Sequence, residues 1–120
     1  MNFAQDYPGW VKAGALDFVV PQIYRASLAA YEAELDRQLA AVTDTSNFIP
    51  GVDVTNSNAE ELIKMIEATR QRKLGGVVVW YHRGLLQANA FEKLKATVFA
   101  EKAYLPWKRP ATGRRTGIMR

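Results

Sequence analysis

Hydrophobic positions follow two different periods along the chain, and their alternation predicts a mixed α/β fold. Apolar residues recur at three- and four-residue steps in segments that we expect to be helices: 5–13, 26–42, 57–73 and about 85–100. Short apolar runs, rich in valine, isoleucine and aromatic residues, lie between the helices and are typical of strands: 17–24, 48–54 and 75–82.

The three predicted strands read as neighbours in a parallel sheet. Residues 77–79 are three consecutive valines, a pattern typical of a parallel strand that is covered on both faces. The strands start at residues 17, 48 and 75, with a predicted helix after each. This spacing indicates repeated βαβ units with right-handed crossovers.

Local signals support the helix boundaries. Asp6 and Pro8 suit the start of the first helix, and Gly14 suits its end. The sequence SNAE at 57–60 has the form of a capping box, in which Ser57 caps the helix and Glu60 reaches back to it.

Three parallel strands are few for a domain, because such a sheet needs cover on both faces and protection at its edges. The pattern is best accounted for by the C-terminal three βα units of a (β/α)8 TIM barrel, which contains eight such units in about 250 residues. On that interpretation the chain is a fragment. A complete small α/β domain is the alternative.

The composition fits one domain without cysteine chemistry. The chain has 120 residues, of which 48% are hydrophobic, and it contains no cysteine. Disulfides and cysteine-based zinc or redox sites are therefore excluded, although the compartment stays open. We expect no membrane span, and the chain begins without the basic-then-apolar pattern of a signal peptide.

The net charge of +4 is concentrated at the C-terminal end. Residues 101–120 contain six basic groups and one acidic group, Glu101, so residues 1–100 are about neutral. We therefore divide the chain into a domain at 1–100 and a basic, flexible tail at 101–120. Such a tail can bind nucleic acid or anionic lipid, or it can be a solvated terminus. The helix-turn-helix, zinc-finger and RNA-binding patterns do not occur, so no nucleic-acid partner is expected.

Groups suited to ligand binding follow the hydrophobic part of the first two strands. In a barrel the active face is formed at the C-terminal strand ends. Gln22 and Tyr24 share a strand face there. The amide of Gln22 and the phenol of Tyr24 are suited to bind sugar hydroxyls. Alternatively, the two side chains form a buried hydrogen-bonded pair that holds neighbouring strands together. Asp53 ends the second strand and is a weak candidate for a catalytic or sugar-binding carboxylate, or else a loop or cap residue.

The third strand ends in aromatic residues. Trp80 can stack on a sugar face or pack in the core, whereas Tyr81 points to the other face. His82 is the only histidine, a possible acid or base or a loop hydrogen-bonding group. Arg25 and Arg83 follow strand ends, where they could hold an anionic sugar substituent or pair with acids.

No cofactor or metal is expected. Gly75 and Gly76 precede a strand rather than open a helix, so they do not form a phosphate-binding loop. The sequence shows no cluster of histidine, aspartate and glutamate at metal-ligand spacing.

The segment NFAQDYPGWVKAGALDFVVPQIYR at 2–25 resembles the late-barrel signature of the glycosyl hydrolase-like 10 family of bacterial cell-wall glycosidases. The resemblance rests on Asn2, the Gln5-Asp6 pair, Trp10, Gly14, Asp17 and the closing Gln22-Ile23-Tyr24-Arg25. Residues 49–51, 60–63 and 75–81 fit the order of the family's later elements, so the resemblance covers roughly residues 2–100.

The resemblance implies a glycoside hydrolase-like protein that hydrolyses O-glycosidic bonds of a bacterial cell-wall or related polysaccharide, in the extracellular space or cell envelope. This segment would contribute substrate contacts through Gln22, Tyr24, Arg25 and Trp80. The family's Asp-rich motif does not occur here, so the 120-residue chain alone is expected to be inactive. The implied partners are a carbohydrate substrate and either the N-terminal barrel half or another copy bound at the open sheet edges. A non-catalytic carbohydrate-binding or interaction module of small α/β type is the alternative function.

Overall fold

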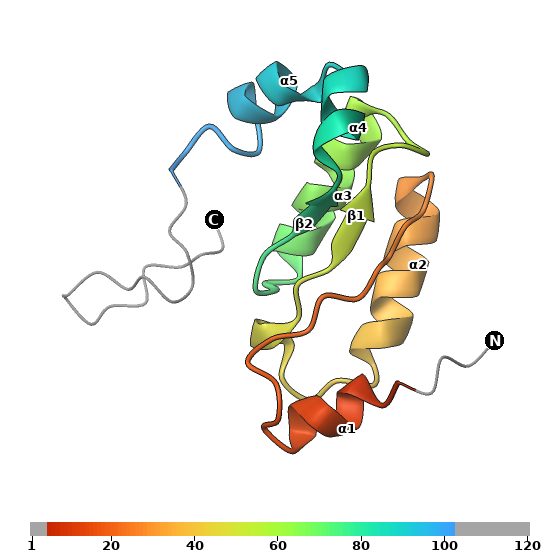
Figure 1. The fold of residues 1–120 in the computed structure, drawn as a ribbon, viewed down its shortest axis with the longest axis vertical. Coiled ribbons are helices and arrows are strands. Elements are labelled where there is room, and N and C mark those ends of the chain that lie inside the picture. Colours follow the sequence, from red (N-terminus) through yellow and green to blue (C-terminus); the bar gives the residue numbers. More distant parts are fainter. Residues whose placement is uncertain (1–4, 103–120) are drawn as a thin grey trace.

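The computed structural model of the protein describes residues 5–102, which form a mixed α/β unit (Figure 1). The elements, in chain order, are α1 (Tyr7–Lys12), α2 (Leu28–Leu39), a short 3-10 turn η1 (Thr45–Asn47), β1 (Gly51–Asp53), α3 (Ala59–Gln71), β2 (Val78–Trp80), α4 (His82–Gln87) and α5 (Ala90–Ala96). The predicted basic tail lies largely outside the described residues, because nothing after Lys102 is described.

The two strands pair in parallel, as the valine-rich sequence predicts, but the prediction that this strand is covered on both faces is wrong, because Val78 is 46% exposed. Val52 lies opposite Val79, and Asp53 lies opposite Trp80. The crossover between the strands is α3, so the βαβ arrangement is confirmed for this pair. Both strands are shorter than the predicted ranges.

The predicted strand at 17–24 is only partly formed. Two isolated parallel bridges, Val19–Phe48 and Gln22–Gly51, hold it beside β1. Pro21 lies between the bridges, and its carbonyl accepts a hydrogen bond from the Gly51 amide. Since proline has no N–H, it cannot donate a hydrogen bond to the neighbouring segment, and this interrupts the pairing.

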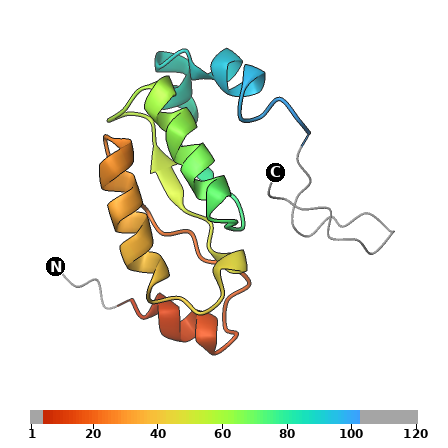
Figure 2. The same ribbon diagram turned by 180° about the vertical axis from the view of Figure 1, so that it is seen from behind.

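Helices α2 and α3 cover one face of these three parallel segments, as the view from behind shows (Figure 2). The face they cover consists of alternate strand residues, including Ile23, Val52 and Val79. The helices contribute apolar side chains to the same core: Tyr31, Leu35, Leu62, Met65 and Ile66. The 3.6-residue pattern of α2 and α3 therefore specified the covered side of the sheet.

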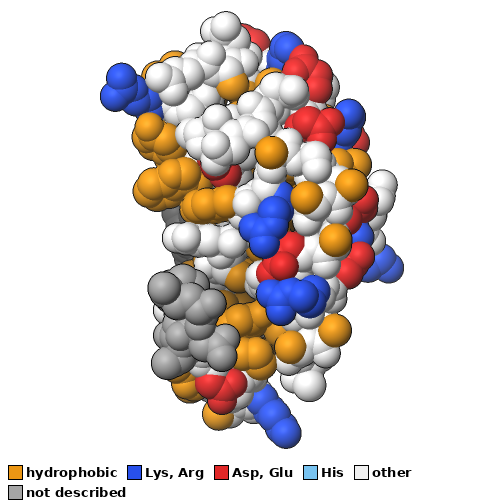
Figure 3. All heavy atoms as spheres, turned by 90° about the vertical axis from the view of Figure 1, so that its right-hand side faces the viewer, with side chains coloured by type: hydrophobic (Ala, Val, Ile, Leu, Met, Phe, Trp, Pro, Cys, Tyr) orange, Lys and Arg blue, Asp and Glu red, His pale blue; other side chains and the backbone are white. Residues whose placement is uncertain are grey.

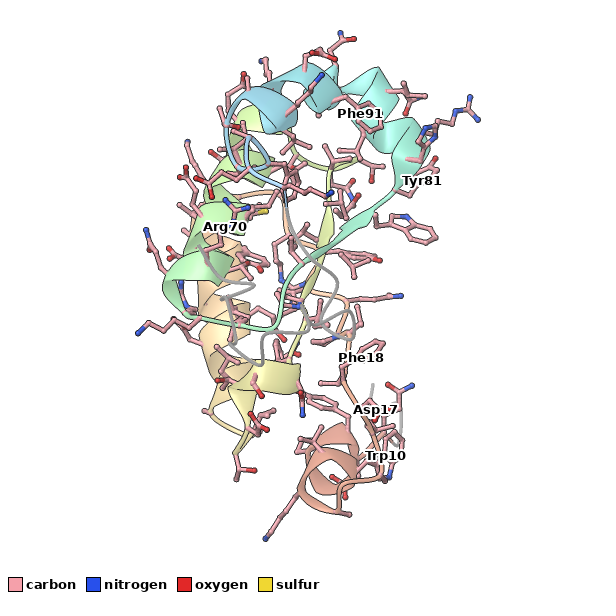
Figure 4. All side chains as sticks on the ribbon, turned by 90° about the vertical axis from the view of Figure 1, so that its left-hand side faces the viewer. Trp10, Asp17, Phe18, Arg70, Tyr81 and Phe91 are labelled. Atoms are coloured by element: carbon pink, nitrogen blue, oxygen red, sulfur yellow. The ribbon has the colours of Figure 1, made fainter. Side chains whose placement is uncertain are left out.

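The other face carries hydrophobic side chains that no described element covers. Phe18, Val20, Val78 and Trp80 are each between about a third and half exposed. Phe18 points away from α2 and α3 in Figure 4. We call this surface the open face: Phe18, Val20, Val78 and Trp80, together with Gln22 and Tyr24, which share their strand side.

The α2 side of the molecule, at about a right angle to the open face, is different in character. Acidic and basic side chains alternate over the α2 side, while hydrophobic side chains gather along the left-hand margin of that view (Figure 3). On this charged side the Arg72 guanidinium joins α3 to α2 through Glu32 and Asp36.

Two helix boundaries differ from the predicted ones. Asn58, rather than Ser57, caps α3 by accepting from the Glu61 amide, because the Ser57 hydroxyl donates to the Asp53 carbonyl. The helix predicted at 85–100 is two helices, α4 and α5. Asn89 separates them in a left-handed conformation (φ 49°), which asparagine tolerates better than most residues.

Within the described residues 5–102, no helix combines the length and apolar character needed to cross a membrane.

Candidate functional site

Two aromatic rings meet at the carboxyl ends of the strands. Tyr24 ends the segment at 17–24 and Trp80 ends β2, so the two residues flank β1 on either side. Their ring centroids are 6.4 Å apart and their planes are inclined by 26°, which is a stacked arrangement. We call Tyr24 and Trp80 the ring pair. Trp80 is about half exposed, at 52%.

Gly51 provides the space in which the ring pair spans the middle strand. A Cβ atom at Gly51 would lie 3.5 Å from Cε1 of Tyr24 and 3.2 Å from the Pro21 carbonyl oxygen. A methyl group at this position would therefore crowd the backbone carbonyl and make ordinary contact with the ring. The phenol ring of Tyr24 consequently lies over the backbone of β1.

Asp53 lies at the end of β1 beside the ring pair, but both oxygens of its carboxylate accept hydrogen bonds from the loop that follows. Oδ1 accepts from the Thr55 amide at 2.7 Å and from the Thr55 hydroxyl at 2.6 Å. Oδ2 accepts from the Asn56 side-chain amide at 2.6 Å. With only 2% of its surface exposed, Asp53 organises the loop that follows β1, which is the loop role that the sequence left open.

The pKa of Tyr24 is raised above its usual value. Partial burial is the main cause, and the nearby negative charge of Asp53 adds to it. Tyr24 is therefore a neutral phenol at ordinary pH. In this form it offers one donor and an acceptor oxygen, as binding to sugar hydroxyls requires.

The structure brings together some of the predicted site residues and separates others. Gln22 is exposed on the open face, on the same strand as Tyr24. Arg25 turns toward α2, where Nη2 lies 3.4 Å from the Glu34 carboxylate and Nη1 donates to the Tyr24 carbonyl at 2.9 Å. Pairing with an acid was one of the two alternatives for Arg25, and it is the arrangement observed.

The residues after Trp80 leave the strand at once. The Trp80–Tyr81 peptide bond is cis, and the two rings are 5.2 Å apart. His82 begins α4, and its ring contacts Phe91 with centroids 5.7 Å apart. In the part of the chain that the structure describes, no group of three or more histidine, aspartate or glutamate residues could hold a metal ion.

Comparison with known proteins adds no relative to this description. No protein-family model matches the sequence, and neither a curated protein nor a solved structure is found that is similar to it. The likeness to the glycosyl hydrolase-like 10 family is therefore still a prediction from the sequence.

Sequence reasoning missed the residues that support the site. The sequence gives no sign that Gly51 and Glu34 support this site. Thr55 and Asn56, which bind Asp53, could have been found, because Asp-x-Thr is a signal for an aspartate that binds the backbone two residues on. Neither the ring contact above Gly51 nor the pairing of Arg25 with Glu34 leaves a local signal.

Proposed function

We propose that this chain contributes the glycan-binding part of a glycoside hydrolase-like protein, as the last three βα units of a (β/α)8 barrel. The single observation that carries the proposal is the ring pair at the carboxyl ends of the strands. A stacked, partly exposed tyrosine and tryptophan offer apolar ring faces beside a neutral hydroxyl. This combination suits a pyranose, which has an apolar C–H face and polar edges.

The barrel interpretation is supported by the one-sided cover of the sheet. Helices pack outside the strands of a barrel and side chains fill its interior, so an isolated piece would have one covered and one open face. Ile23, Val52 and Val79 lie on the covered face, and Phe18 and Val78 lie on the open one. The carboxyl ends of the strands, where the ring pair lies, would be the active face of such a barrel.

A non-catalytic carbohydrate-binding module is the second candidate. It is favoured by Asp53, because glycoside hydrolysis normally uses two carboxyl groups on either side of the scissile bond. Asp53 is the one acidic residue at the carboxyl ends of the described strand segments, and three hydrogen bonds occupy its oxygens. Binding without hydrolysis would need only the ring pair and Gln22.

The proposal predicts that Trp80→Ala weakens glycan binding by the 120-residue chain. The probes are a β-1,4-linked N-acetylglucosamine tetramer and soluble peptidoglycan fragments, titrated while tryptophan fluorescence or amide NMR shifts are followed. Removing a stacking ring should cost about 1–2 kcal/mol, which corresponds to a rise in Kd of about five- to thirtyfold.

Trp10→Ala is the matched control. Trp10 is a tryptophan of similar exposure, 44%, but it lies on α1 at the opposite end of the open face (Figure 4). Its removal should leave Kd within about twofold of the original value, a change of under 0.5 kcal/mol. An equal loss in both variants, or the absence of binding by the unaltered chain to either probe, would contradict the proposal.

A further inference from the structure

The open face is a continuous apolar surface on an otherwise charged molecule. Val78 lies opposite Gly51 in β2 and β1, and Gly51 in turn bridges to Gln22. Val20 and Phe18 precede Gln22 on the same side of the chain. The glycine at the centre leaves the face shallow, so hydrophobic side chains from the two flanking segments border it.

The edges of the sheet are also open. The Val78 amide donates to Pro50 and the Trp80 carbonyl accepts from Val54, so β2 uses these residues to pair with β1. The intervening residue Val79 directs its own backbone N–H and C=O to the other edge, as alternation in a parallel strand requires. Over residues 5–102, no further strand pairs with that edge.

The face has the composition that a contact between identical copies requires. A two-fold interface places the same patch on both sides, so the patch must be complementary to itself. A charged centre would oppose an identical charge, whereas the centre of the open face is apolar and its neighbours Gln22 and Tyr24 are neutral. Residues 5–102 contain 11 basic and 12 acidic groups, a difference of one charge, so two copies would repel each other little.

The area is close to what a small stable interface needs. A fully exposed aromatic side chain presents about 150–250 Å², so the four apolar residues of the open face provide roughly 350 Å² at their observed exposure. Trp10 and Tyr81 lie at the two ends of the same side and, with Gln22 and Tyr24, raise the total to roughly 700 Å² (Figure 4). A standard interface buries about 800 Å² on each partner.

We infer that a second copy of this chain covers the open face, with Val20 and Val78 at the centre of the contact. The inference concerns the 120-residue chain itself. Trp80 and Tyr24 at one end of the face belong both to this contact and to the proposed glycan site, so a second copy and a glycan compete for that end, whereas Val20 and Val78 lie outside the ring pair. Because the area is near the lower limit for a stable complex, the dimer forms in a concentration-dependent way.

The test is the mass of the chain in sedimentation experiments over a concentration series, for the unaltered protein and for Val20→Lys and Val78→Lys. The unaltered chain is expected to dimerise. A lysine at either central position opposes its own copy across the two-fold axis, so the dissociation constant should rise at least about tenfold. Ala33→Lys, on the exposed side of α2, adds the same charge away from the face and should dimerise as the unaltered chain does.

Cross-linking keeps the inference testable if a lysine variant fails to fold. The chain has no cysteine, so a Val78→Cys variant carries one thiol on the open face and an Ala33→Cys variant carries one outside it. A short bis-maleimide should cross-link the first into dimers and leave the second monomeric. A monomeric unaltered chain at every concentration, or equal cross-linking of the two variants, would overturn the inference. Trp80 belongs to both surfaces, so the dimer is judged from the Val20 and Val78 variants, which leave the ring pair intact, and the glycan site from Trp80→Ala.

Discussion

Gly51 lies beside the ring pair, on the same side of the sheet. It lies between Gln22 on one side and Val78 on the other, and a Cβ atom there would contact the Tyr24 ring and crowd the Pro21 carbonyl. The value of glycine at this position lies mainly in the close approach of that carbonyl. The sequence shows the glycine but not the neighbours that require it.

Gly51→Ala is therefore expected to lower the free energy of unfolding by about 1–2 kcal/mol, because the new methyl group meets the Pro21 carbonyl oxygen at 3.2 Å, whereas its 3.5 Å approach to the Tyr24 ring is an ordinary contact. Urea unfolding followed by circular dichroism measures this cost. In a Tyr24→Ala background the cost should be about the same, since the carbonyl remains in place. A clearly smaller cost in that background would show that the ring, and not the carbonyl, resists the methyl group.

At the scale of elements, helices α2 and α3 are joined by a buried polar contact within their apolar interface. The Tyr31 hydroxyl lies 2.7 Å from the Thr69 hydroxyl, which donates to the Met65 carbonyl at 2.8 Å. Burial raises the pKa of Tyr31 to about 12, although the Thr69 hydrogen bond and the charge of Arg72 act in the opposite direction. The contact between the two helices therefore requires a protonated phenol.

This contact predicts a loss of stability at alkaline pH. Tyr31 ionises near pH 10 when unfolded and near 12 when folded, so the native state holds the extra proton between these values. The Tyr31 contribution is fully present below pH 10 and is lost as the pH rises to 12, with a total change of about 2–3 kcal/mol. Urea unfolding at several pH values in this window measures the slope.

Tyr31→Phe should be less stable at pH 8, because Thr69 loses its partner, but its slope between pH 10 and 12 should be much smaller. Tyr24→Phe is the control, and most of the slope should persist in it because its phenol is only partly buried. The explanation would be wrong if the Tyr31→Phe slope equalled that of the unaltered chain.

For the whole molecule, a covered face and an open face decide what the chain can do alone. α2 and α3 bury one side of the parallel segments, and the ring pair lies at their carboxyl ends on the other side. In this arrangement Asp17 lies at the amino end of its segment and Asp53 at the carboxyl end of β1, so two strand acids do not face one ligand. Binding and hydrolysis are therefore separate expectations for this chain.

The purified 120-residue chain should not hydrolyse 4-methylumbelliferyl glycosides or soluble peptidoglycan, since a pair of carboxyl groups is missing at the ring pair. Release of the fluorophore over hours, compared with a buffer blank, measures this. Turnover that Asp53→Asn abolished would show that Asp53 is catalytic after all and that its partner acid lies elsewhere in the chain. Asp17→Asn is the matched control and should change nothing.

The sequence by itself determined most of the order of helices and strands, the parallel direction of the strands and the face that α2 and α3 cover, although it joined α4 with α5 and extended the first strand too far. These features follow from hydrophobic patterns that act over a few residues, such as the helical period of α2 and α3 and the run of valines at 77–79. It also placed Tyr24, Asp53 and Trp80 at strand ends, because alternation and strand direction fix that position.

Only the tertiary structure decided how these residues meet. Some features depend on contacts between segments that are distant in the chain: the pairing that Pro21 interrupts, the position of the Tyr24 ring over Gly51, and the salt bridge of Arg25 with Glu34. The hydrogen bonds of Asp53 depend on a choice between competing partners. The break between α4 and α5 at Asn89 was also decided by the tertiary structure. The cap at Asn58 was decided in the same way, since asparagine and serine offer similar local energies and the surrounding contacts select one.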